Sequence, residues 1–214
     1  HSFCNLVLWD KSKVRNNHRQ KMGSFLHFFN PRKLRGAIIC MLVLAFIAAP
    51  VTAETPPPVI AAASSLRFVL PDIAAAFTRD TGLRVRLSFG SSGNIARQIA
   101  QGAPYQMFLS ADQKYVRDLA AAGRTVDDGE VYAYGRIVLF IPDGSPLTDV
   151  DFPDGYGEAF STGRAGRFAI ANPVHAPYGR AARQALVHAG LWKIMEPHLL
   201  YGENVAQAAQ FAAS

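Results

Sequence analysis

Two successive strand-to-helix transitions, each marked by a pair of serines, restrict the fold of this sequence more than any other feature. The apolar run Val59–Ala63 is followed by Ser64-Ser65 and then by a helical pattern. The segment Leu83–Phe89 alternates with period two, as a half-buried strand does, and leads through Ser91-Ser92 into a second helical pattern. The chain therefore begins its fold as strand, serine pair and helix, repeated.

Serine is a preferred N-cap, because its hydroxyl can accept a hydrogen bond from a free backbone N–H of the first helical turn. A single serine pair before a helix indicates only such a cap. Two helix N-termini that face one another would also offer hydroxyls, free N–H groups and the positive ends of two helix dipoles. The repeated pattern predicts a site for a small anion that needs no lysine or arginine.

The order of elements predicts an α/β fold with a parallel sheet covered on both faces. The first part has strands at Val59–Ala63, Arg84–Phe89 and Gln106–Ser110, and helices over about Ser65–Thr81, Gly93–Gln101 and Gln113–Ala122. Pro71 should kink or split the first of these helices. After Val131–Tyr134, a second α/β unit starts near residue 135, with strands at Gly135–Ile141, Phe168–Ala171 and Leu199–Tyr201 and helices over Arg180–Ala189 and from Val205 onward.

The first 53 residues predict a leader and not a part of the fold. A basic segment is followed by the apolar run Ala37–Ala49 and by Val51-Thr52-Ala53, which predicts a secretory signal peptide cleaved after Ala53. The alternative is a membrane anchor, for which the apolar run falls short of the about 20 residues that spanning requires. Met22 is a plausible start, so the domains expected are 1–53 as upstream region and signal peptide, 54–134 as the first lobe and 135–214 as the second.

Charge and cysteine content narrow the function. The net charge of +6 arises in the leader, and the remaining chain is close to neutral, so no nucleic-acid partner is indicated. Both cysteines, Cys4 and Cys40, also lie in the leader. A mature chain would have no disulfide and no cysteine metal site, and its core alone would hold it.

Six segments, in this order and spacing, resemble the periplasmic molybdate-binding proteins of ABC importers. They are Ala61–Leu66, Phe89–Ile99, Gly102–Pro104, Phe108–Asp112, Asn172–Gly179 and Gly202–Gln207. The resemblance implies a two-lobed class II periplasmic-binding-protein fold, each lobe a mainly parallel sheet flanked by helices. It also implies high-affinity binding of molybdate or tungstate in the periplasm and delivery to the membrane permease of an ABC importer, by a monomer that is not an enzyme and has no cofactor besides the ligand.

The resemblance places the oxyanion between neutral groups. It matches Ser65, with Ser64 adjacent, and Ser92 to two serine contacts, and the backbone N–H groups of Tyr178 and Val205 to two others. Molybdate would thus be held through Ser65, Ser92, Tyr178 and Val205. A last contact in the family would lie beyond Ser214, and we expect the chain and its second lobe to be incomplete there. Tyr105–Met107 depart from the family pattern, with an effect expected on packing only.

Several alternatives remain open at this point. The site could take sulfate, phosphate or another tetrahedral oxyanion, and the chain could be an exported phosphate- or sulfate-ester hydrolase or a ligand sensor. A hydrolase needs a nucleophile–base pair, and the serine motifs contain neither a Gly-x-Ser-x-Gly elbow nor a histidine. Arg67 and Arg97 are expected in solvated roles. We expect His175 to shape its turn and Asp112 to cap a helix.

Overall fold

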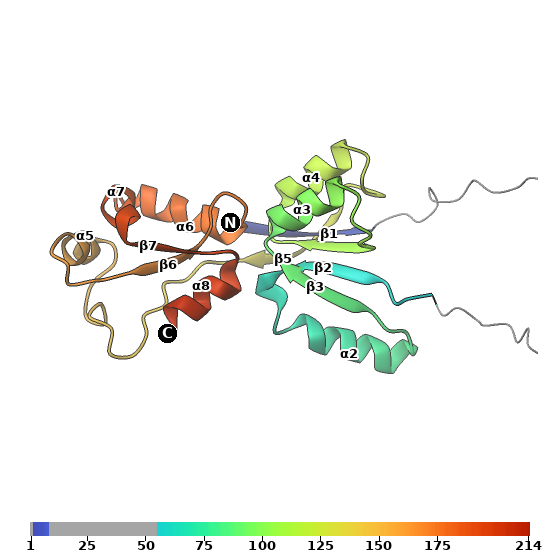
Figure 1. Ribbon diagram of the computed structural model, residues 1–214, viewed down its shortest axis with the longest axis horizontal. Helices are drawn as coiled ribbons and strands as arrows, with labels where there is room; N and C mark the ends of the chain where they lie inside the picture. The colour runs from blue at the N-terminus through green and yellow to red at the C-terminus, as the bar shows by residue number, and fades with distance from the viewer. Residues whose placement is uncertain (1, 9–54) are drawn as a thin grey trace, which may run out of the picture. The chain divides into compact units, whose positions relative to one another are not determined.

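The computed structural model describes residues 2–8 and 55–214 (Figure 1). Ser2–Leu8 and Pro57–Ser214 belong to one compact unit. The fold is α/β, with a five-stranded sheet and a two-stranded sheet, each flanked by helices. We call the five-stranded sheet with its helices the first lobe, and the two-stranded sheet with its helices the second lobe.

The strands of the first lobe lie in the order β3-β2-β4-β1-β5. Their bounds are Arg86–Gly90 for β3, Val59–Ala63 for β2, Met107–Ser110 for β4, Ser2–Leu8 for β1 and Glu130–Gly135 for β5. β2 is central among the parallel strands, because Ala61 pairs with Ser88 of β3 on one side and with Phe108 of β4 on the other. The three parallel strands therefore end together at one edge of the sheet.

Strand β1 corrects one expectation from the sequence. The sequence predicts that residues 1–53 form a leader outside the fold, yet Ser2–Leu8 pair antiparallel with β4 and with β5, and so lie between them. Among the described strands β4 and β5 do not pair with each other, and β1 joins them into one sheet. The expected signal peptide and its cleavage site lie outside the described residues.

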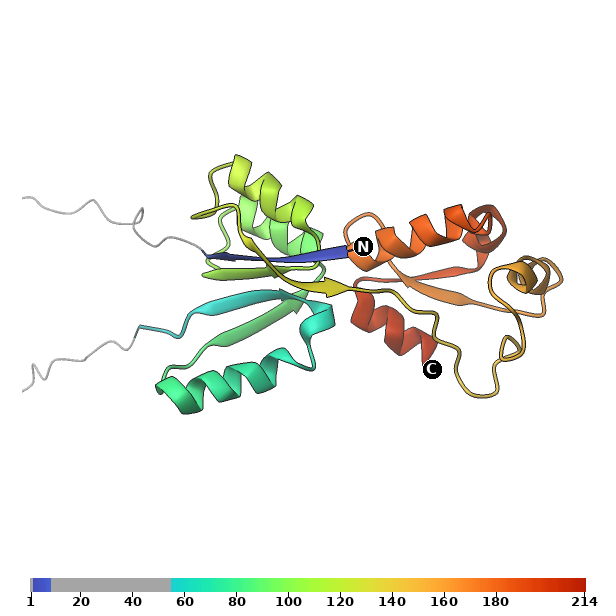
Figure 2. The same cartoon turned by 180° about the vertical axis from the view of Figure 1, so that it is seen from behind.

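In the second lobe, β6 (Phe168–Ala171) and β7 (Leu199–Gly202) pair in parallel, with Ala169 opposite Leu200. The connection to β7 runs through α6 (Pro177–His188), α7 (Trp192–Met195) and the short 3₁₀ helix η2 (Glu196–His198). After β7 the chain enters α8 (Val205–Ala212), which packs against both strands. Figures 1 and 2 show α6 and α8 on opposite faces of this sheet.

The helices of the first lobe are also divided between the two faces of its sheet. α2 (Leu70–Thr81) lies on one face, and α3 (Ser92–Ala100) and α4 (Gln113–Ala121) lie together on the other (Figures 1 and 2). Pro71 splits the predicted helix and does not kink it: Ser64–Leu66 form the 3₁₀ turn η1, and α2 begins one residue before the proline. Proline suits a first helical turn, where its missing N–H would have no acceptor.

Two expectations for the region between the lobes are wrong. Arg136–Ile141 form no strand, although their sequence is apolar and β-branched. Ile137–Phe140 are exposed, and among the described residues no strand lies beside them to accept their hydrogen bonds. The loop expected over Pro142–Gly157 instead contains the start of α5 (Asp154–Ser161), whose Tyr156 and Phe160 are buried. The expected lobe boundary at residue 135 falls on the last residue of β5.

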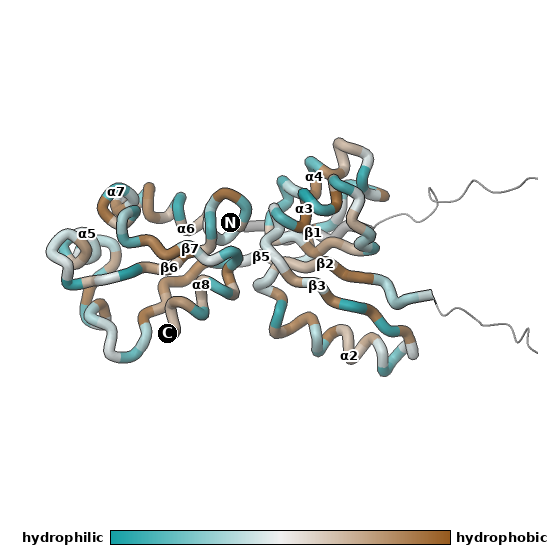
Figure 3. The backbone as a smooth tube through the Cα atoms, in the orientation of Figure 1, coloured by the Kyte–Doolittle hydropathy of each residue, from teal (hydrophilic) through white to brown (hydrophobic). Residues whose placement is uncertain are grey.

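Each lobe has its own hydrophobic core. In the first, the buried side chains of Ile95, Ile99, Phe108 and Val116 pack between the sheet and α3–α4. In the second, Tyr156, Phe160, Leu186 and Met195 are the centre of a cluster beside β6. Figure 3 shows hydrophobic segments along β2 and β6, which carry these cores. No helix in the part of the chain that the structure describes is long and apolar enough to cross a membrane.

Candidate oxyanion site

A small pocket lies where five turns meet, and every one of these turns follows the carboxyl end of a parallel strand. Its empty volume is about 190 Å³, part of which is open solvent. It is lined by Ala63, Ser64, Ser65, Gly90, Ser91, Ser92, Ala111, Ala176, Pro177, Tyr178, Asn204 and Val205. The carboxyl ends of parallel strands are the usual place for ligands in open α/β sheets, and here two sheets contribute to one pocket.

The five residues that the sequence singled out all line this pocket. Ser64 and Ser65 come from the turn after β2, and Ser92 comes from the turn after β3. Tyr178 and Val205 come from the second lobe, at the starts of α6 and α8. Arg67, Arg97, Asp112 and His175, which were considered beside them, are not among the lining residues. None of the lining residues has a charged side chain.

The serine hydroxyls do not cap the helices, and this corrects the simplest interpretation of the two motifs. The N-cap of η1 is Ala63 and the N-cap of α3 is Ser91, and neither side chain makes a capping hydrogen bond. The fully buried Ser92 instead accepts a hydrogen bond of 2.9 Å from the backbone N–H of Ala111. A hydroxyl that accepts one bond still has its own proton to donate, so Ser92 can act as a donor in the pocket.

Helix starts supply the second kind of donor. α3, α6 and α8 all begin at the pocket, and the first N–H groups of a helix have no acceptor within that helix. In α8 the side chain of Asn204 accepts from Ala206 N and Gln207 N at 3.1 and 3.2 Å. The Asn204 side chain thus accepts from the N–H groups after Val205, and Val205, the first helical residue, lines the pocket. The aligned dipoles of these helices favour a negative charge at this point.

His175 joins the two lobes beside the pocket. Its Nδ1 lies 2.9 Å from the hydroxyl oxygen of Ser91, and its Nε2 lies 3.5 Å from a carboxylate oxygen of Glu203. Its carbonyl oxygen accepts a 3.0 Å hydrogen bond from Gly93 N. The other carboxylate oxygen of Glu203 accepts from the Asn94 amide, whose own oxygen accepts from Arg97. His175 thus does more than shape its own turn.

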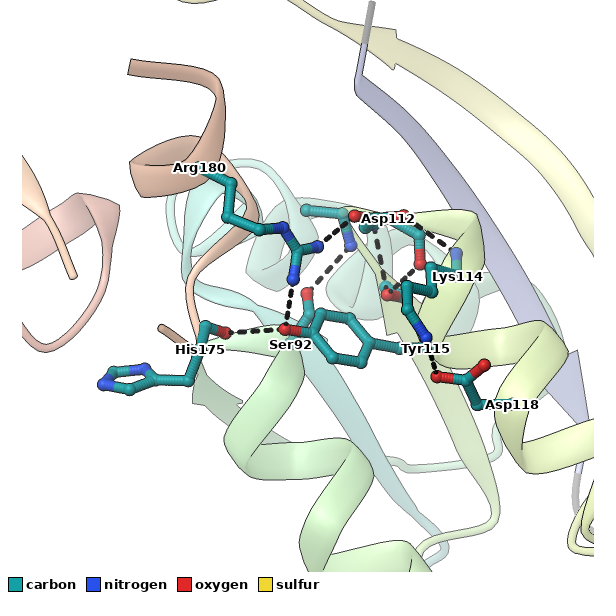
Figure 4. Close-up of polar contacts among 9 residues, drawn as sticks. Ser92, Asp112, Lys114, Tyr115, Asp118, His175 and Arg180 are labelled. Atoms are coloured by element: carbon teal, nitrogen blue, oxygen red, sulfur yellow. Dashed lines mark hydrogen bonds and ion pairs between the residues drawn. The ribbon is translucent and has the colours of Figure 1, made fainter. Parts of the chain in front are cut away.

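A second connection between the lobes is made by Arg180 of α6. Its guanidinium forms an ion pair with Asp112 and donates a 2.7 Å hydrogen bond to the hydroxyl of Tyr115. The same guanidinium lies over the Tyr115 ring, 4.9 Å from its centroid. Figure 4 shows Arg180 reaching from its helix toward both residues, with the imidazole of His175 directed away from them. Asp112 also caps α4 by accepting from Lys114 N at 2.8 Å, as predicted.

Tyr178 crosses between the lobes with its ring. The ring packs against Ala63 and Ala111, which are buried residues of the first lobe. A Cβ added to Gly135, at the end of β5, would collide with the Tyr178 hydroxyl. A side chain at position 135 would therefore force this tyrosine hydroxyl to move.

Two functional contacts were missed from the sequence. The serine motifs themselves contain no histidine, because the partner of Ser91, His175, is 84 residues away in the sequence. The Arg180–Asp112 pair spans 68 residues, and Asp112 already had an adequate explanation as a cap. The only signal for both was that His175 and Arg180 flank the same turn-rich segment as Tyr178.

Comparison with known proteins assigns the class of protein to which this fold and site belong. Residues 58–214 match the family described as bacterial extracellular solute-binding protein, and the chain belongs to that family. The resemblance to periplasmic molybdate-binding proteins, predicted from the sequence, is likewise confirmed. The molybdate-binding protein ModA of Rhodobacter capsulatus is 34% identical over 187 residues, which cover 86% of this chain and 70% of that protein.

Two further relatives carry the same name. ModA of Azotobacter vinelandii is 36% identical over 72% of this chain and 60% of its own length. ModA of Escherichia coli is 36% identical over 69% of this chain and 57% of its own length. The chain therefore spans about 57 to 70% of the length of these relatives.

Solved structures confirm the expected fold class. The periplasmic molybdate-binding protein of Azotobacter vinelandii superposes with a TM-score of 0.56 at 27% identity, over 73% of this chain and 66% of that one. The substrate-binding domain of a molybdenum ABC transporter from Clostridium difficile has the same fold, with a TM-score of 0.50 at 23% identity over the same shares of the two chains.

Proposed function

We propose that this protein binds molybdate or tungstate in the pocket between its lobes and delivers the oxyanion to the permease of an ABC importer. The observation that carries the proposal is the composition of the pocket. Serine hydroxyls and the starts of three helices converge on it from two sheets, and no charged side chain lines it. Such a site suits a small anion whose oxygens all accept hydrogen bonds.

The chemistry of a buried dianion supports this assignment. A charge taken out of water without partners costs many kcal/mol, so each oxygen needs a donor at hydrogen-bond distance. The proposed donors are the hydroxyls of Ser65 and Ser92, with Ser64 adjacent, and the N–H groups of Tyr178 and Val205. Because they come from both lobes, the bound anion would favour the form in which the lobes are together.

The names of the relatives favour molybdate over other oxyanions. Three relatives at 34 to 36% identity are called molybdate-binding proteins. Sulfate has the same charge and shape but is smaller, so a rigid set of dipolar donors would select against it by cavity size and donor distance. Tungstate has nearly the same size and geometry as molybdate, and we include it for that reason.

Membership of the family supports a proposal for the cellular location, the oligomeric state and the partner of this protein. As a member of the bacterial extracellular solute-binding proteins, the chain would be exported to the periplasm and work there as a monomer. It would need no cofactor besides the transported ligand, and its partner would be a membrane permease. We propose that it is not an enzyme, because its relatives are binding proteins.

One observation favours a second candidate, an exported ester hydrolase. Ser91 lies 2.9 Å from a histidine that in turn faces Glu203, and this arrangement is the nucleophile–base pair that the sequence did not reveal. A nucleophile needs space for a substrate carbon, phosphorus or sulfur atom beside its oxygen, whereas Ser91 is 3% exposed. Hydrolysis of p-nitrophenyl phosphate and p-nitrophenyl sulfate that is abolished by Ser91→Ala would establish this second function.

The test of the first function is isothermal titration of the full-length protein with molybdate, tungstate, sulfate and phosphate. We expect tight binding of molybdate and tungstate and no heat from sulfate or phosphate. Binding of sulfate or phosphate alone would change the transported ion but keep the class of protein. No binding of any of the four would overturn the proposal.

A further inference from the structure

Ser91 was not among the residues predicted to contact the anion, yet it lines the pocket beside Ser92. Its side chain is almost completely buried and does not cap α3. Its hydroxyl oxygen lies 2.9 Å from His175 Nδ1. Ser91 therefore meets the pocket on one side and His175 on the other. The single hydroxyl proton of Ser91 can be donated either to His175 or to a ligand in the pocket, but not to both at once.

A hydroxyl has one proton to donate and two lone pairs to accept with. When Nδ1 of His175 has no proton, the Ser91 proton is donated to it and is lost to the pocket. When Nδ1 carries a proton, His175 donates to Ser91, and the Ser91 proton is free to point at the anion. Ser92 already has the second arrangement, because its oxygen accepts from Ala111 N.

The contact with Glu203 determines which nitrogen of the His175 imidazole carries a proton, and therefore whether the ring can donate to the Ser91 hydroxyl. Its carboxylate lies 3.5 Å from Nε2, so a proton on Nε2 is favoured in every state of the ring. Nδ1 can then carry a proton only when the imidazole is doubly protonated. Asn94 donates to Glu203 and is itself bonded by Arg97, which holds the carboxylate in this position.

The other ionisable groups around His175 are bonded elsewhere. From α4, the Tyr115 hydroxyl meets the His175 carbonyl oxygen at 3.4 Å and does not contact the ring. From α6, Arg180 is paired with Asp112 of the first lobe. Arg97 of α3 reaches the ring only through Asn94 and Glu203. Glu203 is thus the charged group that faces the imidazole directly.

We propose that Ser91 is a further hydrogen-bond donor to the bound oxyanion, and that His175, held by Glu203, is the positioning residue that turns the Ser91 hydroxyl into the pocket. This inference rests on the proposed function. Binding of the dianion and uptake of one proton by His175 then favour each other, as linkage requires. Anion affinity rises as the imidazole gains its second proton and falls as it loses it.

The experiment is a molybdate titration of the full-length protein at a series of pH values between about 5 and about 8, the range in which an ordinary histidine side chain changes charge. For the unmodified protein we expect affinity to fall with rising pH. Ser91→Ala should lower affinity at about pH 6 by about tenfold to a hundredfold, the scale of one hydrogen bond to a charged group, and should flatten the pH profile. Thermal unfolding of each variant confirms that it is folded.

His175→Asn tests the positioning role separately. The asparagine amide stands near the place of Nδ1 and can donate to Ser91 at any pH, so we expect affinity to be retained and the pH dependence to disappear. His188→Asn is the matched control, because His188 is exposed at the end of α6, and it should leave the profile unchanged.

The outcomes separate this inference from the function on which it rests. If the unmodified protein does not bind molybdate at any pH, the proposed function fails. If it binds but Ser91→Ala keeps both affinity and pH profile, Ser91 is not a donor and the inference is overturned. If Ser91→Ala lowers affinity but keeps the slope, His175 acts by its charge alone, and the positioning role is overturned.

Discussion

The backbone N–H of Gly93 donates a 3.0 Å hydrogen bond to the carbonyl oxygen of His175, and this single contact joins a helix of the first lobe to a turn of the second beside the pocket. The two residues can approach this closely only because position 93 has no side chain. A Cβ there would lie 2.5 Å from that oxygen and 2.6 Å from the Tyr115 hydroxyl. This one of the several contacts between the lobes thus depends on glycine at position 93.

Gly93→Ala should separate the lobes without unfolding either of them. The added methyl group would displace the His175 turn, because backbone atoms cannot yield as a flexible side chain can. We expect molybdate affinity to fall by about fivefold to about a hundredfold, on the scale of about 1–3 kcal/mol for overpacking. Titration calorimetry measures the loss, and Gly166→Ala is the control, because no atom lies within 4 Å of a Cβ at that position. Equal affinities for the two variants would contradict the prediction.

Ser92→Ala should weaken both binding and stability. The variant removes a donor from the pocket and leaves the buried Ala111 N–H without its acceptor, each at a cost of about 1–3 kcal/mol. Titration and urea unfolding measure the two effects independently. Ser161→Ala, at an exposed serine whose hydroxyl bonds within α5, should change neither. Unchanged affinity in the Ser92 variant would remove this residue from the site.

Arg180→Met should weaken binding and leave the stability of each lobe almost unchanged. The methionine keeps much of the arginine stem but cannot pair with Asp112 or donate to Tyr115. The pair is partly exposed, so we expect a loss of about 0.2–1 kcal/mol in binding that shrinks as salt is raised. Arg183→Met is the control, because Arg183 lies over Trp192 within the second lobe. A loss of equal size in both variants would argue against a role for Arg180 between the lobes.

Tyr156→Phe should stabilise the protein, most of all at high pH. The Tyr156 side chain is fully buried, and its hydroxyl has no hydrogen-bond partner among the described residues, so its removal should raise the free energy of unfolding by about 1 kcal/mol. Burial raises the pKa of this tyrosine above its usual value.

The sign of the pH dependence follows from that raised pKa. Below about pH 10 the tyrosine is neutral in both the folded and the unfolded chain. Above it, the unfolded chain ionises first, so the unmodified protein loses stability as pH rises through the folded pKa. Burial also raises the pKa of Tyr201. Because the unmodified protein and the Tyr156→Phe variant both retain Tyr201, the difference between their free energies of unfolding reports on Tyr156 alone. Urea unfolding at neutral and alkaline pH should show a gap that widens; a constant gap would contradict the assignment.

Much of the fold could be predicted because its elements are encoded locally. Val59–Ala63 and Phe168–Ala171 form strands with the predicted bounds, since each is a continuous apolar run bounded by polar or proline-containing segments. Arg136–Ile141 have an equally strand-like sequence, but a strand needs a neighbour, and that requirement is not visible in the segment itself. For the same reason Ser2–Leu8, which pair with strands more than 90 residues away in sequence, were not recognised.

The five predicted site residues lie together in one pocket, but the hydrogen bonds of the serines differ from the capping bonds that the sequence suggests. Capping was the simpler of two interpretations of the serine pairs, beside the anion site. In the structure the Ser91 hydroxyl instead contacts His175, and the Ser92 hydroxyl accepts from Ala111 N. Both partners are distant in sequence or in another motif, so no local pattern could assign them. The sequence did place each serine pair at the end of a strand. Because neighbouring parallel strands end at the same edge of the sheet, this placement was enough to predict that the two pairs lie close together.

The uncharged lining of the pocket has a consequence for where such a protein can work. Attraction between a fixed positive charge and an anion weakens as dissolved salt accumulates around both, with a screening length of about 10 Å at 0.1 M and about 3 Å at 1 M. Hydroxyls and backbone N–H groups in direct contact with a buried ligand are hardly exposed to that screening. A scavenger built in this way would capture its trace nutrient about equally well in dilute and in saline surroundings.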